Sequence, residues 1–348
     1  MSSNLEKVIE NVRCPGCQGL LKPSDHSTPD VELDLLCVQC GASFPVIDGI
    51  PRLLSSTLRE ALLRNGSASA KDQPKVATAR SFGFEWTRFP EMYQEWQQTF
   101  LDYMQPHSPD FFEGKKVLDA GCGNGRFAYY AAKYGAEVWA IDLGSAVEVA
   151  RRNTETMRNV RVLQADLHHL PFPPESFDFI YSIGVLHHLP EPEPAFQNLL
   201  NFLRPGGAIQ IYLYWKPERQ PLKSAMLAGV TATRKITTRL PHPLVYALSY
   251  PAALAAFGLF VWPYKLLGQV PGLKSLAEKL PMKQYARFPF RVCINDQLDR
   301  LSAPIEKRYT RQEVADWLSR AGLEEQVVSA NYGWVGTGRK PRRLAAAG

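Results

Sequence analysis

An acidic residue followed by three glycines at alternate positions is the feature of this chain that most directly implies ligand chemistry. These residues are Asp119, Gly121, Gly123 and Gly125. The apolar residues before the glycines predict a buried strand, and residues 127–132 predict a helix. Glycines let a ligand press against the backbone, and the first turn of a helix offers unpaired N–H groups. The pattern therefore predicts a small-ligand site at a strand–turn–helix junction.

The spacing of the glycines argues against a dinucleotide at this junction. The fingerprint G-x-G-x-x-G requires a third glycine where this chain has Arg126. The carboxylate of Asp119 would also repel a pyrophosphate and attract a cation. S-adenosylmethionine (SAM) carries an ammonium and a sulfonium and has no phosphate. The stretch resembles motif I of the class I SAM-dependent methyltransferases.

Four further segments follow in the order of that family. A predicted strand at 137–142 ends in an acid, where the carboxylate can accept both hydroxyls of a ribose. Predicted strands at 160–167, 177–189 and 208–213 follow; the first of them ends in another acid, and the second carries the family's post-strand signature. The resemblance covers about residues 115–213. It implies an α/β, Rossmann-like fold, with a mostly parallel seven-stranded sheet and helices on both faces.

Matching motifs assigns a cofactor-binding set to this sequence. Asp119 and the first two glycines would hold the methionyl end of SAM, Asp142 the ribose, and Asp166 and Leu167 the adenine. The full set consists of Asp119, Gly121, Cys122, Gly123, Asn124, Gly125, Asp142, Leu143, Asp166, Leu167, Ser182 and Ile183.

The same comparison assigns roles near the transferred methyl group. Ser182 and Ile183 would line the floor near the sulfonium, and Cys122 would be a small wall residue rather than a nucleophile. Methyl transfer needs a base only when the acceptor is a hydroxyl, an acidic carbon or a protonated amine. His187 and His188 follow the fourth strand, and His187 is the predicted catalytic base. The alternative is that these histidines only shape the cofactor pocket.

Four cysteines near the N-terminus predict a metal site. Cys14 and Cys17 form one C-x-x-C pair, and Cys37 and Cys40 form a second. Two such pairs at this separation are typical of a zinc site, and four thiolates leave no open position, so the zinc would be structural. Residues 44–54 resemble the end of the small Trm112-type zinc domains, which are partners and activators of methyltransferases. The chain is thus predicted to begin with a zinc ribbon.

The predicted domain organisation has three parts. Residues 1–54 form the Trm112-like zinc-binding module, and residues 55–114 form a linker and an aromatic cap segment. Residues 115–348 form the methyltransferase domain, with a helical insertion at about 216–300 after the fifth strand. The aromatic residues of 81–90 favour a cap over the cofactor; a surface helix anchored by its aromatic side chains is the alternative.

The insertion contains a run, 240–264, that has no Lys, Arg, Asp or Glu. Its length allows a membrane span, but Pro251 falls in its middle. The predicted final strands must also return to the same sheet, and no second apolar run brings the chain back. Two other interpretations stay open: a buried helical subdomain, and a lid for a lipophilic acceptor with peripheral membrane contact through residues 240–290.

The chain has 348 residues and a mild net charge of +6. This charge is compatible with nucleic acid or anionic lipid as a partner but predicts neither of them. The first residues lack the apolar core of a signal peptide, which predicts a cytoplasmic protein, with peripheral membrane contact as an extension.

The predicted function is transfer of a methyl group from SAM to a small-molecule or lipid-linked acceptor by in-line displacement. An RNA (rRNA or tRNA) methyltransferase using the zinc module for substrate binding, and a non-catalytic SAM-binding scaffold, are the alternatives. The acceptor atom and the oligomeric state stay open.

Overall fold

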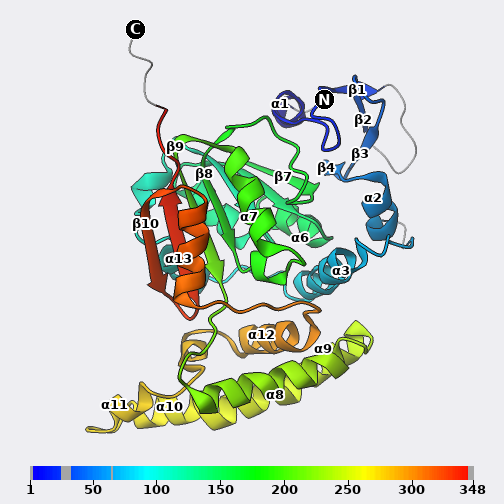
Figure 1. Ribbon diagram of the computed structural model, residues 1–348. Coiled ribbons are helices and arrows are strands. Elements are labelled where there is room, and N and C mark those ends of the chain that lie inside the picture. The colour runs from blue at the N-terminus through cyan, green and yellow to red at the C-terminus, as the bar shows by residue number, and fades with distance from the viewer. Residues whose placement is uncertain (1–2, 25–32, 64–65, 344–348) are drawn as a thin grey trace. The chain divides into compact units, whose positions relative to one another are not determined.

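The computed structural model describes residues 3–24, 33–63 and 66–343 (Figure 1). The chain divides into two compact units. Unit 1 comprises Met1–Glu218 and Ile305–Gly348, and unit 2 comprises Arg219–Pro304. Each unit is described by itself.

A twisted sheet forms the centre of unit 1. Seven of its strands run in the order β7-β6-β5-β8-β9-β11-β10. The first five are parallel to one another, and β11 is antiparallel to both β9 and β10. This arrangement confirms the predicted mostly parallel seven-stranded sheet. The strands are β5 (Lys116–Ala120), β6 (Glu137–Asp142), β7 (Val160–Ala165), β8 (Phe177–Ile183), β9 (Leu203–Leu213), β10 (Glu324–Ala330) and β11 (Trp334–Arg339).

Helices cover both faces of this sheet because the chain moves in two directions from β5. The connections β5–α5–β6–α6–β7 run one way, and β8–α7–β9 runs the other way. Right-handed crossovers in opposite directions place their helices on opposite faces. On the α7 face, α13 lies beside α7 (Figure 1). The rings of Phe196 and Trp317 stack between these two helices. The helices are α5 (Arg126–Lys133), α6 (Ala146–Asn153), α7 (Pro192–Asn201) and α13 (Arg311–Arg320), with short 3₁₀ turns η1 (Pro109–Phe112) and η2 (Leu186–His188).

The N-terminal module extends the sheet. Its strands β1 (Leu21–Ser24), β2 (Leu33–Cys37), β3 (Ser43–Ile47) and β4 (Ile50–Leu53) pair antiparallel. β4 then pairs parallel with β7, where Arg52 lies opposite Gln164. The described residues thus form one eleven-stranded sheet. Val12 and Leu35 of the module share a single apolar core with Leu163 of β7.

The segment 55–114, predicted as a linker and cap, is mainly helical. α2 (Ser56–Leu63) is followed by α3 (Gln73–Arg88) and α4 (Glu95–Met104), and the chain begins with α1 (Ser3–Asn11). Pro74 stands at the start of α3, where a missing N–H leaves no hydrogen bond unmade. The aromatic stretch of the sequence therefore falls on the second half of a long helix.

Unit 2 is helical. α12 packs against α8 and α9 within this unit. α9, a π-helical turn (η3) and α10 form one continuous helix, His242–Leu267, which is long and apolar enough to cross a membrane. Length and composition alone support such a span, and only 28% of its most apolar stretch is buried. The elements are α8 (Pro221–Thr237), α9 (His242–Ala256), η3 (Phe257–Val261), α10 (Trp262–Leu267), α11 (Lys274–Ala277), η4 (Lys283–Arg287) and α12 (Phe290–Ser302).

Candidate functional site

The predicted cofactor residues follow the carboxyl ends of neighbouring strands. Asp166 follows β7, Asp142 ends β6, Asp119 lies near the end of β5, and Ser182 lies near the end of β8. These strands are adjacent in the order β7-β6-β5-β8. Because parallel strands lie about 4.8 Å apart, the four side chains span one edge of the sheet. Open α/β sheets bind ligands at this edge, where the strand order reverses between β5 and β8.

The glycine turn brings backbone close to its neighbours. Gly121 has φ of 97°, and a Cβ there would overlap Val185 after β8. A Cβ on Gly123 would lie 2.8 Å from the indole Nε1 of Trp86. Gly125, at φ 80°, caps the N-terminus of α5. Side chains at these positions would displace the walls of the site, which is why only glycine fits here.

Asp119 is the buried acid of this turn. It is 2% exposed, and its Oδ2 has no hydrogen bond of ordinary geometry to any described residue. Burial raises the pKa of Asp119 to about 7; the nearby Tyr181 phenol and the Arg126 guanidinium oppose this rise, and the Asp142 charge adds to it. A buried carboxyl with a spare acceptor is suited to a cationic ligand group, which would favour its ionised form.

Asp142 fixes the turn to β6. Its Oδ2 accepts a hydrogen bond from the Gly123 N–H at 3.0 Å, and its Oδ1 accepts one from the Gly144 N–H at 3.0 Å. Burial raises the pKa of Asp142, and these backbone donors act in the opposite direction. Each carboxylate oxygen has a second lone pair, so both can still accept a hydrogen bond from a ribose hydroxyl.

Asp166 is held by a cation that the sequence did not reveal. Lys75 of α3 lies 2.8 Å from its Oδ2, and the His168 N–H donates to its Oδ1 at 3.0 Å. Burial opposes ionisation of Asp166, but His168, His169 and the Lys75 charge outweigh it and keep its pKa well below the usual range. Asp166 is thus a buried carboxylate in this structure, and Lys75 occupies part of the predicted adenine end.

Helix α3 runs along the same edge of the sheet. Ala79 and Gly83 lie against Gly144 and Ser145 after β6, where a Cβ on either glycine would collide. One residue before Gly83, the ring of Phe82 lies 4.8 Å from that of His188. The helix therefore passes from the β7 end of the site to the β8 end, as a cap would. That the segment 55–114 acts as a cap stays a prediction.

Replacing Lys75 by Met is expected to destabilise the protein by about 3 kcal/mol, because it leaves a buried carboxylate without its cation. Both side chains of the Lys75–Asp166 pair are less than a tenth exposed. Urea unfolding of Lys75→Met protein measures this loss. Lys22→Met is the control, because Lys22 is exposed and should change stability by less than about 0.5 kcal/mol. Equal midpoints for the two variants would contradict the prediction.

The other predicted cofactor residues lie around the same edge. The Ser182 hydroxyl donates to the Ala120 carbonyl at 2.8 Å, and Ile183 follows it half-buried. Burial raises the pKa of the Cys122 thiol well above its usual range, which disfavours a nucleophilic role. The backbone carbonyls of three other predicted residues accept hydrogen bonds from side-chain amides of adjoining segments. Asn153 donates to Asn124, Gln164 to Leu143, and Asn198 to Leu167.

His187 lies fully buried in η2, just after β8. Neither ring nitrogen has a hydrogen-bond partner among the described residues, and the ring packs at a tilt against Tyr214, with 3.8 Å between centroids. Burial, together with His188 and the Arg308 charge, holds the pKa of His187 well below its usual value. Burial therefore favours the neutral ring but also makes it a weaker proton acceptor, and its catalytic role stays a prediction. His188 instead donates from Nδ1 to the Ile305 carbonyl at 2.6 Å.

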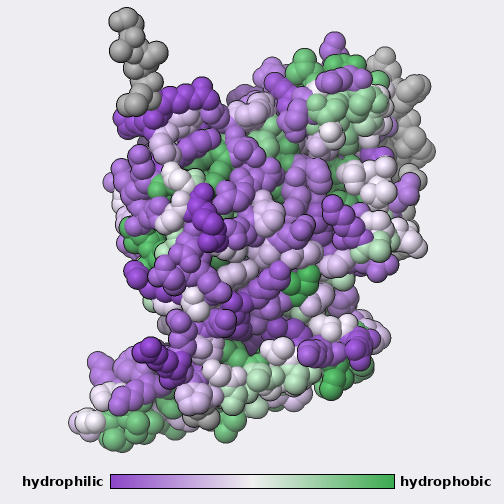
Figure 2. All heavy atoms as spheres, viewed as in Figure 1, coloured by the Kyte–Doolittle hydropathy of each residue, from purple (hydrophilic) through white to green (hydrophobic). Residues whose placement is uncertain are grey.

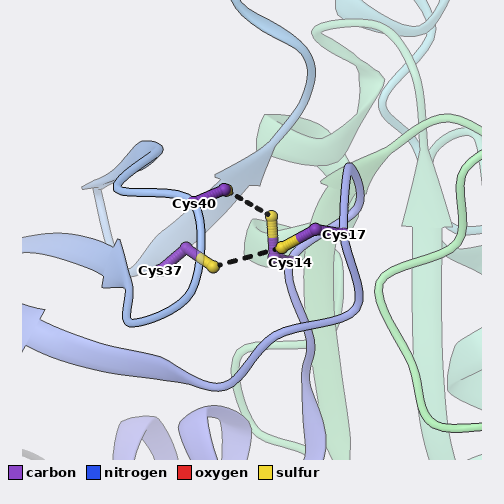
Figure 3. Close-up of side chains that lie close together, drawn as sticks. All are labelled: Cys14, Cys17, Cys37 and Cys40. Atoms are coloured by element: carbon purple, nitrogen blue, oxygen red, sulfur yellow. Dashed lines mark hydrogen bonds between the residues drawn. The ribbon is translucent and has the colours of Figure 1, made fainter.

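The four N-terminal cysteines meet at one point. Their sulfur atoms all lie within 4.8 Å of one another, and their side chains converge from two loops (Figure 3). Cys14 Sγ lies 3.7 Å from Cys40 Sγ, and Cys17 Sγ lies 3.5 Å from Cys37 Sγ. Tetrahedral zinc with Zn–S bonds of about 2.3 Å separates its sulfurs by about 3.8 Å. The donor set therefore fits a four-thiolate metal site.

The thiols of this cluster differ in their electrostatics. Burial raises the pKa of Cys14 to about 12. At Cys37 burial acts in the same direction, but the backbone N–H groups of Cys40 and Gln39 and the neighbouring thiols lower its pKa to about 6. A bound cation would favour the thiolate form at all four positions.

Comparison with known proteins agrees with this geometry. Residues 118–211 match the family described as Methyltransferase domain. A malonyl-[acyl-carrier protein] O-methyltransferase of Pectobacterium atrosepticum is 29% identical over 180 residues, 51% of this chain and 68% of that protein. A tRNA U34 carboxymethyltransferase of Desulfotalea psychrophila is 31% identical over 167 residues, 44% of this chain and 51% of that protein.

Among solved structures, the magnesium protoporphyrin IX methyltransferase of Synechocystis PCC 6803, with bound SAH, has a TM-score of 0.45 and 13% identity. The match covers 78% of this chain and 100% of that chain. The curated relatives are matched over about half to two thirds of their own length. The sheet topology is that of a Rossmann-like α/β fold, and residues 118–211 of this fold are similar to the methyltransferase-domain family. The enzyme class that these comparisons support is that of the SAM-dependent methyltransferases.

Proposed function

We propose that this protein transfers a methyl group from SAM to a small-molecule or lipid-linked acceptor. The observation that carries the proposal is the buried Asp119 carboxyl beside the glycine turn, whose Oδ2 has no hydrogen bond of ordinary geometry to a described residue. The ammonium group of SAM supplies the opposite charge. A nicotinamide dinucleotide would instead bring a pyrophosphate toward the buried acid Asp119.

The residues present fit SAM along the whole edge. Asp119 would hold the amino group, the two oxygens of Asp142 the ribose hydroxyls, and Asp166 the adenine end. The sulfonium supplies a methyl group with a good leaving group, so the protein mainly has to align the acceptor and exclude water. Helix α3 supports the second task, because Trp86 and Phe82 cover the turn and the residues after β8. His187 would take a proton from a hydroxyl or an acidic carbon.

The N-terminal module forms part of the same proposal. Cys14, Cys17, Cys37 and Cys40 would hold one structural zinc ion in a Trm112-like ribbon. The ion would add to the apolar core that the module shares with β7. We propose residues 1–54 as this module, 55–114 as linker and cap, and 115–348 as the methyltransferase domain with its insertion at about 216–300. A cytoplasmic location is part of the proposal.

The names of the relatives are compatible with two chemical classes of methyl acceptor for this chain. The names of some of them specify a carrier-linked malonyl group or ubiquinone, and the name of one specifies a tRNA uridine. The apolar composition of 240–264 favours a lipophilic acceptor for this chain. The tRNA-specific relative makes RNA the second candidate.

Transfer of labelled methyl from SAM tests the proposal. Purified full-length protein is incubated with SAM and, in parallel, with cell lipid extract, a small-molecule extract or total RNA. We expect label in the lipid or small-molecule fraction and none from Asp119→Asn protein. Label in RNA alone would contradict a lipid or small-molecule acceptor and support RNA, the second candidate. SAM binding by calorimetry without label in any fraction would favour a non-catalytic scaffold and overturn the proposal.

A further inference from the structure

Positive charge is concentrated in unit 2. Residues 219–304 contain 12 Lys and Arg but only 3 Asp and Glu, a net charge of +9. The whole chain has a net charge of +6, so the remainder carries −3. Several of these cations are exposed: Lys223, Lys235, Arg239, Lys265, Lys274 and Lys279. A field of one sign on one unit attracts a partner of the opposite sign.

The continuous helix 242–267 also exposes large apolar side chains. They recur every three to six residues, and their exposed fractions run from 39% at Leu248 to 66% at Leu266. Figure 2 shows hydrophobic side chains along the visible face of this unit. Exposed apolar side chains in such a row mark an interaction surface. We call this row the apolar stripe: Leu244, Leu248, Leu254, Leu259, Trp262 and Leu266.

The same helix also has a buried side. Val245, Ser249, Ala253, Ala256 and Val261 are buried, at steps of four, four, three and five residues. The step of five falls on the π-helical turn Phe257–Val261, which adds one residue and returns Val261 to the buried face. Unit 2 therefore packs one side of this helix against its own α12 and leaves the other side open.

We propose that unit 2 docks on an anionic phospholipid surface, with the apolar stripe inserted between the headgroups and the surrounding lysines and arginines on the lipid phosphates. Apolar side chains with a tryptophan, flanked by cations, are the combination that interfacial helices use. The charge of unit 2 complements anionic lipid and would repel a second copy of itself. The inference concerns unit 2 alone and does not depend on methyl transfer.

Interfacial docking accounts for this structure better than a span. The buried side of the helix packs on α12, which carries Asp296, Asp299 and Arg300. If helix 242–267 spanned a membrane, it would either bring the charged residues of α12 into the hydrocarbon or lose its packing against α12. The chain also enters unit 2 after β9 and leaves it before β10, two strands of one sheet. Within the described residues, 242–267 is the single candidate span. A second span that would bring the chain back across the membrane to β10 is therefore not found among them.

Flotation of the full-length protein with vesicles tests the proposal. Wild-type protein should bind phosphatidylglycerol-containing vesicles at least about tenfold better than pure phosphatidylcholine vesicles, and high salt should weaken this binding. Replacing Leu259, Trp262 and Leu266 together by Ser should reduce binding by at least about tenfold. Replacing Lys274 and Lys279 by Gln should reduce it about fivefold for each charge.

The matched control is a triple serine variant of Leu20, Leu36 and Val38, which are exposed apolar residues of unit 1. It should bind vesicles like the wild type. Thermal melts followed by circular dichroism check that both variants fold. Equal loss in the control, or no binding of wild type to anionic vesicles, would overturn the proposal. So would resistance to alkaline carbonate extraction from cell membranes, which indicates a span, or a wild-type dimer that the stripe variant dissociates.

Discussion

Cys14→Ser protein is expected to contain no zinc and to unfold at a temperature at least about 10 °C lower than the wild type. A structural zinc site contributes about 10–16 kcal/mol of binding free energy to folding in small zinc modules. Three thiolates and a serine bind the ion far more weakly. Elemental analysis after dialysis measures the metal, and a thermal melt followed by circular dichroism measures the stability.

The loss should extend beyond the first fifty residues, because the module is joined to the central sheet. β4 pairs with β7, and the buried Arg52 guanidinium lies 2.7 Å from Glu148 Oε1 of α6. The control is Cys293→Ser, since Cys293 is a buried cysteine of α12 outside the cluster. It should keep one zinc ion per chain. Cys14→Ser protein with full zinc content and an unchanged melt would refute the metal site.

The sequence was sufficient to predict the central sheet because its strands are short, apolar and punctuated by acids or glycine. Val117 and Leu118 before the glycine turn, and the acid at the end of each following strand, mark the order of β5, β6 and β7. Neighbouring parallel strands end at one edge, so the pattern also predicted that the candidate cofactor residues lie along that edge. The four cysteines were equally readable, because a pair spaced C-x-x-C already defines a local turn.

Contacts between segments far apart in the chain could not be predicted from the sequence. Lys75 and Asp166 are separated by 91 positions, and a single lysine in a helical segment carries no signal of its partner. The pairing of β4 with β7 was missed for the same reason, because Arg52 looks like an exposed residue in sequence and is 1% exposed in the structure. A buried arginine in an otherwise apolar run, Ile50–Leu54, is the one hint the sequence offered.

The insertion was ambiguous for a different physical reason. Its helix is apolar on every side, so periodicity could not separate the face that packs on α12 from the apolar stripe. The π-helical turn at Phe257–Val261 shifts the phase between the two halves and further blurs the pattern. Only the structure shows that Val245 and Val261 share a buried side while Leu254 and Trp262 are exposed.

Asp119→Asn protein is expected to bind SAM about 100-fold more weakly than the wild type. The variant keeps the size of the side chain and removes the charge that would pair with the ammonium group of SAM, and a buried hydrogen bond between charged groups is worth about 2–3 kcal/mol. Calorimetry measures both affinities. Ser182→Ala is the control within the site, because its hydroxyl already bonds the Ala120 carbonyl. It should weaken binding by less than about tenfold.

The pH dependence of binding should distinguish charge from shape. The pKa of Asp119 in the free protein is raised to about 7 by burial, so the carboxyl is mostly protonated in acid. The cation of SAM binds the ionised form, and its affinity should therefore rise with pH until Asp119 is ionised. Between about pH 5.5 and pH 7.5 the increase should be about 20-fold, and above about pH 8 it should reverse as the α-amino group of SAM loses its proton. In Asp119→Asn protein the acid limb should be flat. A wild-type affinity that is constant below neutral pH would show that the Asp119 carboxyl does not hold the ammonium group.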